Sequence, residues 1–406
     1  METQTLHVPD IVSVDDHVLE PPDLWTNRLP AKYRQAGPRV VRQRVARSGR
    51  GQGGEIYTFA PHDEGDWCDV WYYEDKWLMP LLGIYAAMGG KSPGFTPVVF
   101  EDLADGAYKQ KDRLAAMDQN HVEAALCFPN TVPRFCAQTF YEGSDHELGM
   151  ACIRAYNDWI HEEWGAGDGR GRLFGATLIP LWDPAAAAEE IRRCADNGAV
   201  AVSFPENPHP LGLPSICNRE SYWDPVYQAC SDTNNVLCMH IGSSSQLPST
   251  CPDAPFTVSA VLISQAAQGS LCDFIYSKTL QRFPDLKLCY SEAQVGWMPY
   301  LLERADRQYG RSHTGLDRKP SDFIPGRVYG CIFDDAHGLR SHAEGIGIDQ
   351  ICFETDYPHA DSTFPDSRGV LAKLSESAGL NDEQVHKVAR GNAITAFDLA
   401  RLGIRN

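Results

Sequence analysis

The sequence has no CxxC pair and no paired zinc-finger spacing, although it contains 13 cysteines. This absence argues against a structural zinc module. Several cysteines lie inside apolar, strand-like runs, where a thiol behaves as a small hydrophobic side chain. We therefore expect most of the cysteines to be reduced core residues, above all Cys127, Cys238, Cys289, Cys331 and Cys352.

Long apolar runs and basic side chains are also scarce. No uninterrupted apolar run approaches the roughly 18 residues that span a membrane. The opening residues METQTLHVPD lack the basic and apolar parts of a signal peptide, so we expect a cytoplasmic protein. The 36 Lys and Arg residues are outnumbered by 54 Asp and Glu residues, which gives a net charge of −18. This balance argues against nucleic acid or an anionic membrane as partner and favours a small-molecule substrate.

Short apolar runs alternate with longer helical patterns, which predicts βαβ units and a parallel sheet. Their continuous Val, Ile, Leu and Cys character is typical of strands covered on both faces. Eight such runs favour one α/β domain over residues 1–406, a (β/α)8 TIM barrel. An open doubly wound sheet is the alternative, but no GxGxxG motif follows any expected strand. The expected strands are 10–16, 122–128, 173–180, 198–204, 236–241, 286–291, 328–333 and 350–355.

Residues 26–105 form a long insertion after the first expected strand, and part of it is dense in aromatic side chains. Long segments that follow barrel strands usually cover or shape the site. We therefore predict a lid in which Trp71, Tyr72 and Trp77 contact the substrate, while a local aromatic core is the other interpretation. The apolar helix expected over 257–282 is either a barrel cover or the face of a homodimer.

Polar side chains recur at the C-terminal ends of four expected strands, and these ends converge on one mouth in a TIM barrel. Asp15 and His17, two residues apart on an extended strand, project to the same side. Crowded carboxylates repel one another unless a cation compensates them. We therefore predict a shared metal site, with His359 as a further ligand or as a partner that orients Asp356. The candidate ligands are Asp15, His17, Glu20, His240, Glu292 and Asp356.

Four ordered segments, VDDHVLEPPDLW, SEAQVGWMPYLLERAD, DYPHADSTFP and VARGNAITAFDL, resemble the amidohydrolase superfamily in its amidohydrolase-2 branch. The resemblance implies a metal-bearing (β/α)8 barrel that performs hydrolysis, hydration or non-oxidative decarboxylation, often with one zinc or manganese ion. The usual family motif has HxH on strand 1, histidines on strands 5 and 6, and an aspartate on strand 8. This chain departs from the motif because Asp15 replaces the first histidine and Glu292 replaces the histidine of strand 6.

These replacements make the predicted ligand set rich in carboxylates, which favours iron or manganese over zinc. The set resembles that of the amidohydrolase-fold non-heme diiron monooxygenase of platensimycin and platencin biosynthesis. We therefore favour a monooxygenase with two iron ions that hydroxylates an apolar, terpenoid-like molecule with O2 and an electron donor. The alternatives are a zinc or manganese hydrolase or non-oxidative decarboxylase, and an inactive binding barrel. The expected catalytic residues are Asp356, His359 and Glu292.

Overall fold

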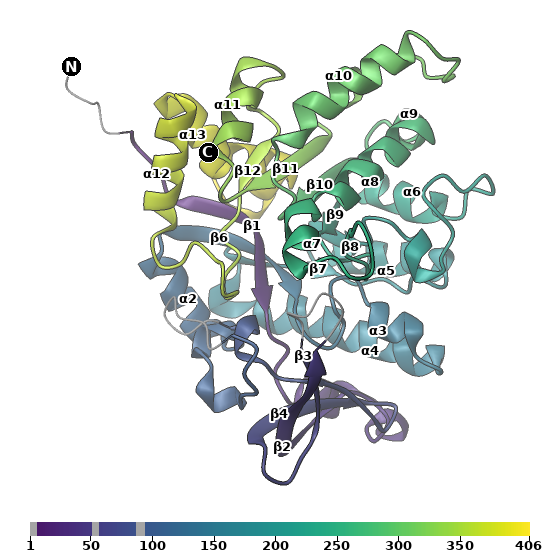
Figure 1. The fold of residues 1–406 in the computed structure, drawn as a ribbon, viewed down its shortest axis with the longest axis vertical. Coiled ribbons are helices and arrows are strands. Elements are labelled where there is room, and N and C mark those ends of the chain that lie inside the picture. Colours follow the sequence, from purple (N-terminus) through teal and green to yellow (C-terminus); the bar gives the residue numbers. More distant parts are fainter. Residues whose placement is uncertain (1–5, 51–56, 87–93) are drawn as a thin grey trace.

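The computed structural model describes residues 6–50, 57–86 and 94–406. Eight parallel strands form one sheet in the order β1-β6-β7-β8-β9-β10-β11-β12, with helices packed around it (Figure 1). The last strand meets the first, because the backbone N–H of Asp356 donates to the carbonyl of Asp15 at 2.9 Å. The predicted TIM barrel is therefore confirmed. Its strands are β1 (Ile11–Val18), β6 (Val122–Pro129), β7 (Leu173–Thr177), β8 (Ala201–Phe204), β9 (Val236–His240), β10 (Lys287–Ser291), β11 (Val328–Ile332) and β12 (Ile351–Phe353).

The strands form where the sequence is continuously apolar, since each is covered by helices outside and by side chains in the lumen. Every residue of β9 and of β11 is buried. β8 begins three residues later than predicted. Gly198 adopts a φ of +92° to turn the chain out of the preceding helix, and its N–H still bonds to Ala195 of that helix.

The helices end and begin where capping residues allow it. The helix α5, for example, starts with Pro184 directly after Asp183, whose side chain accepts from two backbone N–H groups. The α-helices are α1 (Leu24–Arg28), α2 (Gln110–Gln119), α3 (Gln138–Glu142), α4 (His146–Trp159), α5 (Pro184–Asp196), α6 (Asp224–Thr233), α7 (Phe256–Leu262), α8 (Gln265–Tyr276), α9 (Thr279–Arg282), α10 (Trp297–Tyr309), α11 (Ala336–Glu344), α12 (Ser367–Ala378), α13 (Asp382–His386) and α14 (Asn392–Ala396).

The insertion after β1 contains a small antiparallel sheet that the sequence patterns did not reveal. Its strands, in the order β3-β2-β4-β5, lie beyond the C-terminal end of β1 (Figure 1). Trp71 of β4 joins this sheet to α1 through an edge-to-face contact with Trp25, 5.6 Å between ring centroids. The use of 26–105 as a lid stays a prediction. The strands are β2 (Arg39–Arg50), β3 (Tyr57–Pro61), β4 (Asp66–Tyr73) and β5 (Lys76–Pro80).

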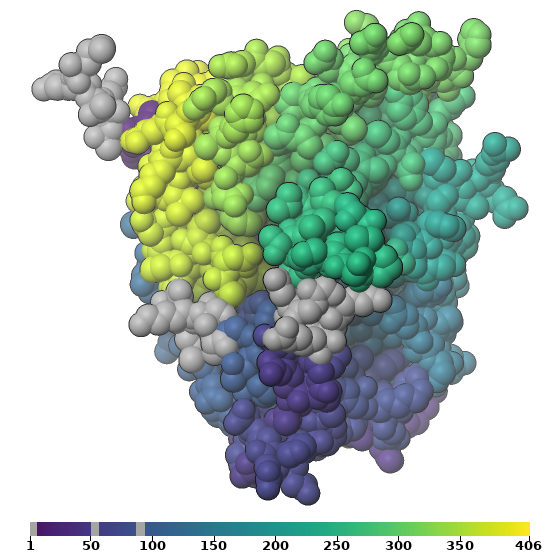
Figure 2. Space-filling view, viewed as in Figure 1, coloured from purple at the N-terminus to yellow at the C-terminus, as the bar shows by residue number. Residues whose placement is uncertain are grey.

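The single helix expected over 257–282 is three helices, α7, α8 and α9. Within it, Phe256–Tyr276 is long and apolar enough to cross a membrane by length and composition, and 33% of its apolar window is buried. α8 packs against α9 and α10. α7 and the loop before it form a raised green patch on the face seen in Figure 2, and Val261 of α7 is 75% exposed. A dimer face and the absence of a membrane partner stay predictions.

The lumen below the mouth is lined in part by thiols. Cys238, Cys289, Cys331 and Cys352 come from four neighbouring strands and are fully buried. All 13 cysteines are free, and 10 of them are buried, which confirms the interpretation of most cysteines as core residues. The apolar and thiol filling closes the lumen, so ligands reach the barrel centre only at its ends.

Candidate metal centre

Two histidines and two aspartates from β1, β9 and the end of β12 meet at the barrel mouth. The Nε2 atoms of His17 and His240 lie 3.1 Å apart. Asp15 Oδ1 is 3.5 Å from His17 Nε2, and Asp15 Oδ2 is 3.3 Å from His240 Nε2. Asp356 Oδ1 faces the same His17 atom at 3.4 Å. The side chains that the sequence predicted to converge thus meet around His17, with Asp15 and His240 on one side and Asp356 on the other.

The tautomers of both histidines follow from their outer partners. His17 Nδ1 lies 3.4 Å from the Pro129 carbonyl, and His240 Nδ1 lies 2.7 Å from the Ile241 carbonyl. A carbonyl oxygen only accepts, so each Nδ1 carries a proton and each Nε2 presents a lone pair to the cluster. Burial and the neighbouring imidazoles hold the pKa of His17 well below its usual value. This orientation through an outer carbonyl is typical of metal-binding histidines.

Asp15 is the acid with the least compensation. It is fully buried, and neither of its carboxylate oxygens has a hydrogen-bond partner. Burial first, and then the charges of Glu354 and Glu292, raise its pKa well above the ordinary value. Since an unpartnered buried carboxylate is costly, these atoms fit a divalent cation that both histidine lone pairs also face.

Glu292 and His359 extend the cluster toward the solvent. Glu292 Oε1 lies 3.6 Å from His240 Nε2 and 3.7 Å from His359 Nδ1. Burial opposes its ionisation, but these two imidazoles outweigh burial and lower the pKa of Glu292 well below its usual range. Two overlapping sets of four residues could hold an ion, and both contain His17 and Glu292. The sets are Asp15, His17, His240 and Glu292, and His17, Glu292, Asp356 and His359.

His359 lies directly beside Asp356. Its Nδ1 lies 2.9 Å from Asp356 Oδ1, and its Nε2 lies 3.1 Å from Asn130 Oδ1. Despite burial, Asp356 and Glu292 raise the pKa of His359 well above its usual value, which favours the cationic ring. Burial raises the pKa of Asp356 well above the ordinary value, although His359 opposes this, and Asp356 Oδ2 has no hydrogen-bond partner.

Glu20 lies outside both four-residue sets. One oxygen accepts from the backbone N–H of Asn130 at 2.9 Å. The other accepts from the backbone N–H of Thr131 at 3.0 Å and from its hydroxyl. Its carboxylate is therefore satisfied by the loop after β6, and it positions Asn130, the partner of His359.

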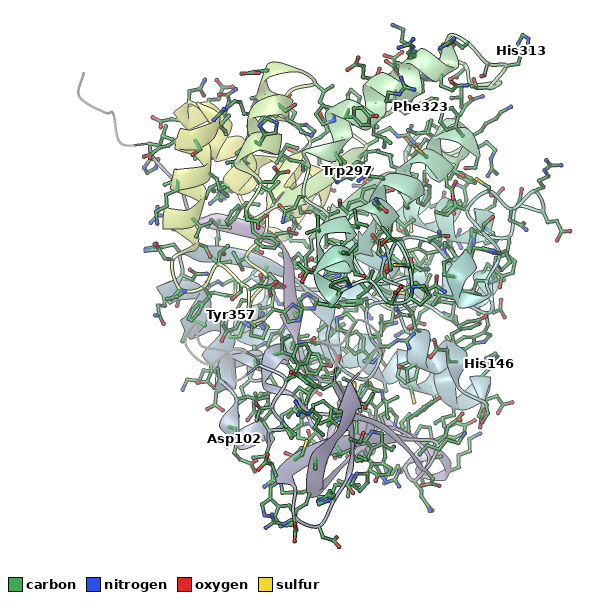
Figure 3. All side chains as sticks on the ribbon, viewed as in Figure 1. Asp102, His146, Trp297, His313, Phe323 and Tyr357 are labelled. Carbon is green, nitrogen blue, oxygen red and sulfur yellow. The ribbon has the colours of Figure 1, made fainter. Side chains whose placement is uncertain are left out.

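Asp16 points away from the cluster on the other side of β1. It accepts from Ser13 and Thr355, and Arg113 lies 3.6 Å away. Burial raises its pKa to about 6, and Arg113 opposes this shift. Arg113 also donates to the His17 carbonyl and stacks over the ring of Tyr357, which is labelled in Figure 3, at 4.6 Å. Asp16 and Arg113 therefore fix the backbone that carries His17.

Sequence patterns missed two buried acids near the centre. Glu354 accepts from the N–H of Glu292 at 3.1 Å, and its other oxygen has no partner. The sequence offered one signal for Glu354: it stands two residues before Asp356, and residues two apart on an extended chain project to the same side. Glu206 follows β8, neither of its oxygens has a partner, and burial raises its pKa to about 8. Its position at another C-terminal strand end could have identified it.

The cluster opens into a cavity of about 880 Å³, to which Glu292 and His359 contribute their exposed edges. Its other walls come from β5, from the loop after β6 with α3, and from the loop after β9 with Ile263 just beyond α7. Phe135 reaches the metal ligands directly, since its ring stacks on His240 at 4.1 Å and an interplanar angle of 12°. Apolar lining residues include Trp77, Met79, Ile84, Tyr85, Phe135 and Ile263.

The three aromatic residues predicted to contact substrate occupy different places. Trp77 lines the cavity. Trp71 is fully buried between Trp25 and Phe100, and it forms the local aromatic core that was the other interpretation. The hydroxyl of Tyr72 bonds to Gln43, and neither Trp71 nor Tyr72 is among the described residues that line the cavity.

Several characterised proteins resemble this chain. It is 22% identical over 306 residues to a gamma-resorcylate decarboxylase of Polaromonas sp. (strain JS666 / ATCC BAA-500), covering 72% of this chain and 88% of the relative. Its fold matches amidohydrolase map2389c of Mycobacterium avium subsp. paratuberculosis K-10 with a TM-score of 0.68, 21% identity and 98% coverage of both chains. It also matches a dihydroxybenzoic acid decarboxylase of Polaromonas sp. JS666, which has bound manganese and the inhibitor 2-nitroresorcinol (TM-score 0.57, 19% identity, 74% of this chain and 90% of that one).

The prediction of an O2-dependent monooxygenase with two iron ions is wrong. The relatives with a stated activity are decarboxylases, and neither an oxygenase nor a second iron is supported by them. The physical error lies in the ligand count. Glu20, which tilted the interpretation toward a carboxylate-rich iron pair, is saturated by donors of the Asn130–Thr131 loop.

The family assignment rests on a match to most of the chain. The Amidohydro_2 model, described as Amidohydrolase, matches residues 69–399. This range includes β6 to β12 and therefore His240, Glu292, Asp356 and His359, while Asp15 and His17 precede it. The predicted amidohydrolase-2 resemblance is confirmed: the chain belongs to the Amidohydro_2 family of amidohydrolases.

Proposed function

We propose that this protein is a metal-dependent, non-oxidative decarboxylase of a small aromatic acid that carries a hydroxyl group beside its carboxylate. The observation that carries the proposal is the junction of an unpartnered acid and imidazole cluster with a cavity lined by apolar and aromatic side chains. The relatives named for gamma-resorcylate and dihydroxybenzoic acid support the substrate class.

The residues that would hold the ion are Asp15, His17, His240 and Glu292, which form one of the two four-residue sets. Two nitrogen and two carboxylate donors suit manganese or zinc, and the further carboxyl group of Asp356 beside them favours manganese. A bound ion would supply a positive charge on which the carboxylate and phenolate oxygens of the substrate can be held. His240 and His17 are already fixed for this by their outer carbonyl partners.

The cavity walls would orient the substrate ring. Phe135, stacked on His240, offers a flat apolar surface beside a metal ligand, and Trp77 offers another elsewhere in the same cavity. A ring lying against Phe135 would have its carboxylate directed to the cluster, and the apolar walls would exclude water from the carbon that loses CO2. Orientation of this kind converts binding energy into rate.

Asp356 is placed to deliver the proton that replaces CO2. Its raised pKa favours the protonated form, and its Oδ2 has no other partner. The proton would pass from Oδ2 to the ring carbon that bears the carboxylate. The bond to the carboxyl carbon would then break, its electron pair would return to the ring, and CO2 would leave. The imidazolium of His359, 2.9 Å from Oδ1, would stabilise the resulting Asp356 carboxylate.

A direct assay tests the proposal. Protein loaded with Mn²⁺ is incubated without O2 or reductant with 2,6-dihydroxybenzoate, 5-carboxyvanillate and other hydroxybenzoates, and CO2 and phenol formation are followed. We expect stoichiometric CO2 and phenol from at least one ortho-hydroxy acid and none from benzoate, which lacks the hydroxyl group. Failure with every hydroxybenzoate, together with hydrolysis of an aryl ester by the same preparation, would replace the decarboxylase by a hydrolase.

A further inference from the structure

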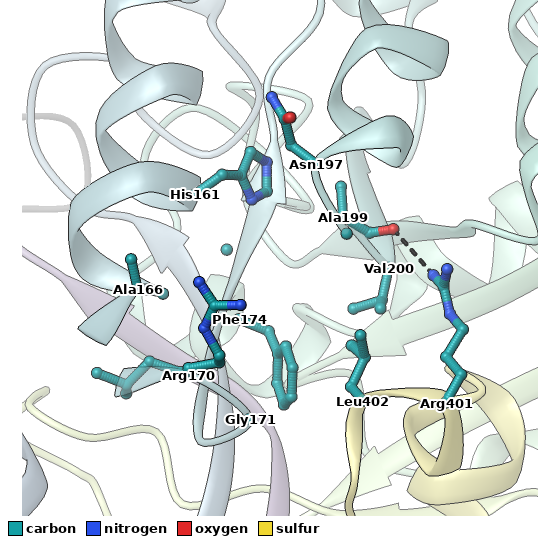
Figure 4. Close-up of a pocket in the computed structure, with 14 residues that line it drawn as sticks. His161, Ala166, Arg170, Gly171, Phe174, Asn197, Ala199, Val200, Arg401 and Leu402 are labelled. Carbon is teal, nitrogen blue, oxygen red and sulfur yellow. Dashed lines mark hydrogen bonds between the residues drawn. The ribbon is translucent and has the colours of Figure 1, made fainter. Parts of the chain in front are cut away.

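A second cavity, of about 340 Å³, lies at the end of the barrel opposite to the metal centre. Leu173 and Phe174 at the start of β7 and Val200 just before β8 form one wall, and the C-terminal residues Arg401 and Leu402 form another (Figure 4). The metal ligands lie at or after the C-terminal ends of their strands. This cavity is therefore separate from the catalytic cavity, and they share no lining residue.

The charge of this cavity is opposite to that of the chain as a whole. Its lining includes two arginines and a histidine but no carboxylate, in a chain whose net charge is −18. The Arg170 guanidinium is exposed and has no hydrogen-bond or ion-pair partner among residues 6–50, 57–86 and 94–406. The second arginine, Arg401, donates to the Ala199 carbonyl at 3.2 Å and forms a long ion pair with Asp398 at 3.7 Å.

His161 adds hydrogen-bonding capacity without charge. His161 is the second residue of a π-helical turn (Ile160–Trp164). Such turns are often found at functional sites. Its Nε2 lies 3.2 Å from the hydroxyl of Thr177, while no hydrogen bond involves its Nδ1 in the described part of the chain. Burial, reinforced by Arg193, lowers the pKa of His161 to about 4, so the ring is neutral at physiological pH.

The remaining lining combines apolar side chains with glycines and the polar Asn197. Leu173, Phe174 and Leu402 line it, and Gly171 keeps a φ of +75° beside them. A Cβ at Gly171 would lie 3.2 Å from the Leu402 carbonyl, so a side chain there would crowd the wall. The cavity thus combines an unpaired cation with an apolar surface of the size that small ligands occupy.

We propose that this cavity binds a small organic anion whose carboxylate or phosphate lies on Arg170 and whose apolar part contacts Phe174 and Leu402. The neutral His161, which lines the same cavity, supplies a further hydrogen-bonding group. The inference concerns a site remote from the metal centre, and it stands whether or not the decarboxylase proposal is correct. A planar guanidinium without a competing acid is well suited to a two-oxygen anion.

Calorimetric titration of the whole, metal-loaded protein tests the site. The probes are phenyl phosphate, benzoate, inorganic phosphate and benzyl alcohol, which separate the two head groups from the apolar part. We expect the aromatic anion with the correct head group to bind more tightly than inorganic phosphate or benzyl alcohol. Arg170→Gln should weaken this binding by at least about tenfold, as expected for loss of a charge-assisted contact.

Arg311→Gln is the matched control, because Arg311 is also exposed and has no side-chain partner in the described chain. This variant should bind like the wild type. Because an aromatic acid can also enter the metal cavity, only binding that is lost in Arg170→Gln and retained in Arg311→Gln is assigned to the second site. Equal binding by both variants, or no binding of any anion, would overturn the proposal.

Discussion

Buried acids at the two sides of strand β1 are stabilised in different ways. On the cluster side, Asp15 has no hydrogen-bond partner for either oxygen. On the other side and at the strand exit, Asp16 and Glu20 accept several hydrogen bonds each. Burial is complete in all three cases, so it does not distinguish them. The number of hydrogen-bond donors distinguishes them. Asp15 has none and needs a cation to compensate its charge, whereas Asp16 and Glu20 have several and hold a strand or a loop in place.

Glu206 represents a third solution. Its carboxyl group is buried without partners, and its pKa of about 8 keeps it protonated near neutral pH. A bound proton thus removes the charge of Glu206, whereas a cation would compensate the charge of Asp15 and hydrogen-bond donors stabilise that of Glu20. The four variants below separate these three solutions, beginning with the largest expected effect.

Asp356→Asn removes the proposed proton donor while it keeps the size of the side chain. We expect kcat for the decarboxylation to fall about 10³-fold, within the range for loss of a positioned acid. Asp361→Asn is the control, since Asp361 also lines the cavity but is exposed. Both variants should keep bound metal by elemental analysis. Near-normal kcat in Asp356→Asn would assign the proton to another group.

Glu206→Gln removes the acid held as a protonated group. The folded pKa of about 8 exceeds the ordinary 4.5, so the folded protein binds the extra proton, and its stability falls as pH rises from about 4.5 to 8. The variant lacks this loss and should exceed the wild type at pH 9 by about 5 kcal/mol, since one pKa unit corresponds to about 1.4 kcal/mol. Urea unfolding of metal-free protein from pH 5 to 9 measures the difference, and the exposed Glu344→Gln should show none.

Asp15→Asn should change metal binding and stability in opposite directions. We expect Mn²⁺ affinity to fall by at least about 100-fold, since that is the upper end of effects for residues that only support metal ligands. Because the pKa of Asp15 is raised in the folded state, its ionisation destabilises the metal-free protein as pH rises, and the variant avoids this. Metal titration and urea unfolding in chelator at pH 8 test both signs. A metal-free variant less stable than the wild type would contradict the assignment of Asp15 as an uncompensated acid.

The barrel could be predicted from the sequence because its signals are local. Each strand is a continuous apolar run, and Asp15, His17, His240 and Asp356 stand at strand ends that the fold brings together. The distance between two strand ends needs no side-chain detail, since the topology alone fixes it. The same holds for the cysteines, whose burial follows from the runs that contain them.

The role of Glu20 could not be predicted in the same way. Its donors come from the loop after β6, 110 and 111 residues away in the chain, and nothing near Glu20 in the sequence indicates them. The antiparallel sheet of the insertion was missed for a related reason. β2 is not an apolar run, because it carries Arg39, Arg42 and Arg44. These arginines are accommodated in the sheet by Asp75, Asp69 and the Gly65 carbonyl, and these partners cannot be identified from the sequence of the strand.

Glu20→Gln tests whether this acid is a structural residue and not a ligand. A glutamine can accept with only one of its two terminal atoms, and its NH2 group would face donors of the Asn130–Thr131 loop. The free energy of unfolding should therefore drop by about 1–3 kcal/mol, with or without metal, while Mn²⁺ affinity stays at the wild-type value. The exposed Glu303→Gln should leave both quantities unchanged. Loss of metal affinity at Glu20 without loss of stability in chelator would return it to the ligand set, and the distinction between donor-held and cation-held acids would then fail at this position.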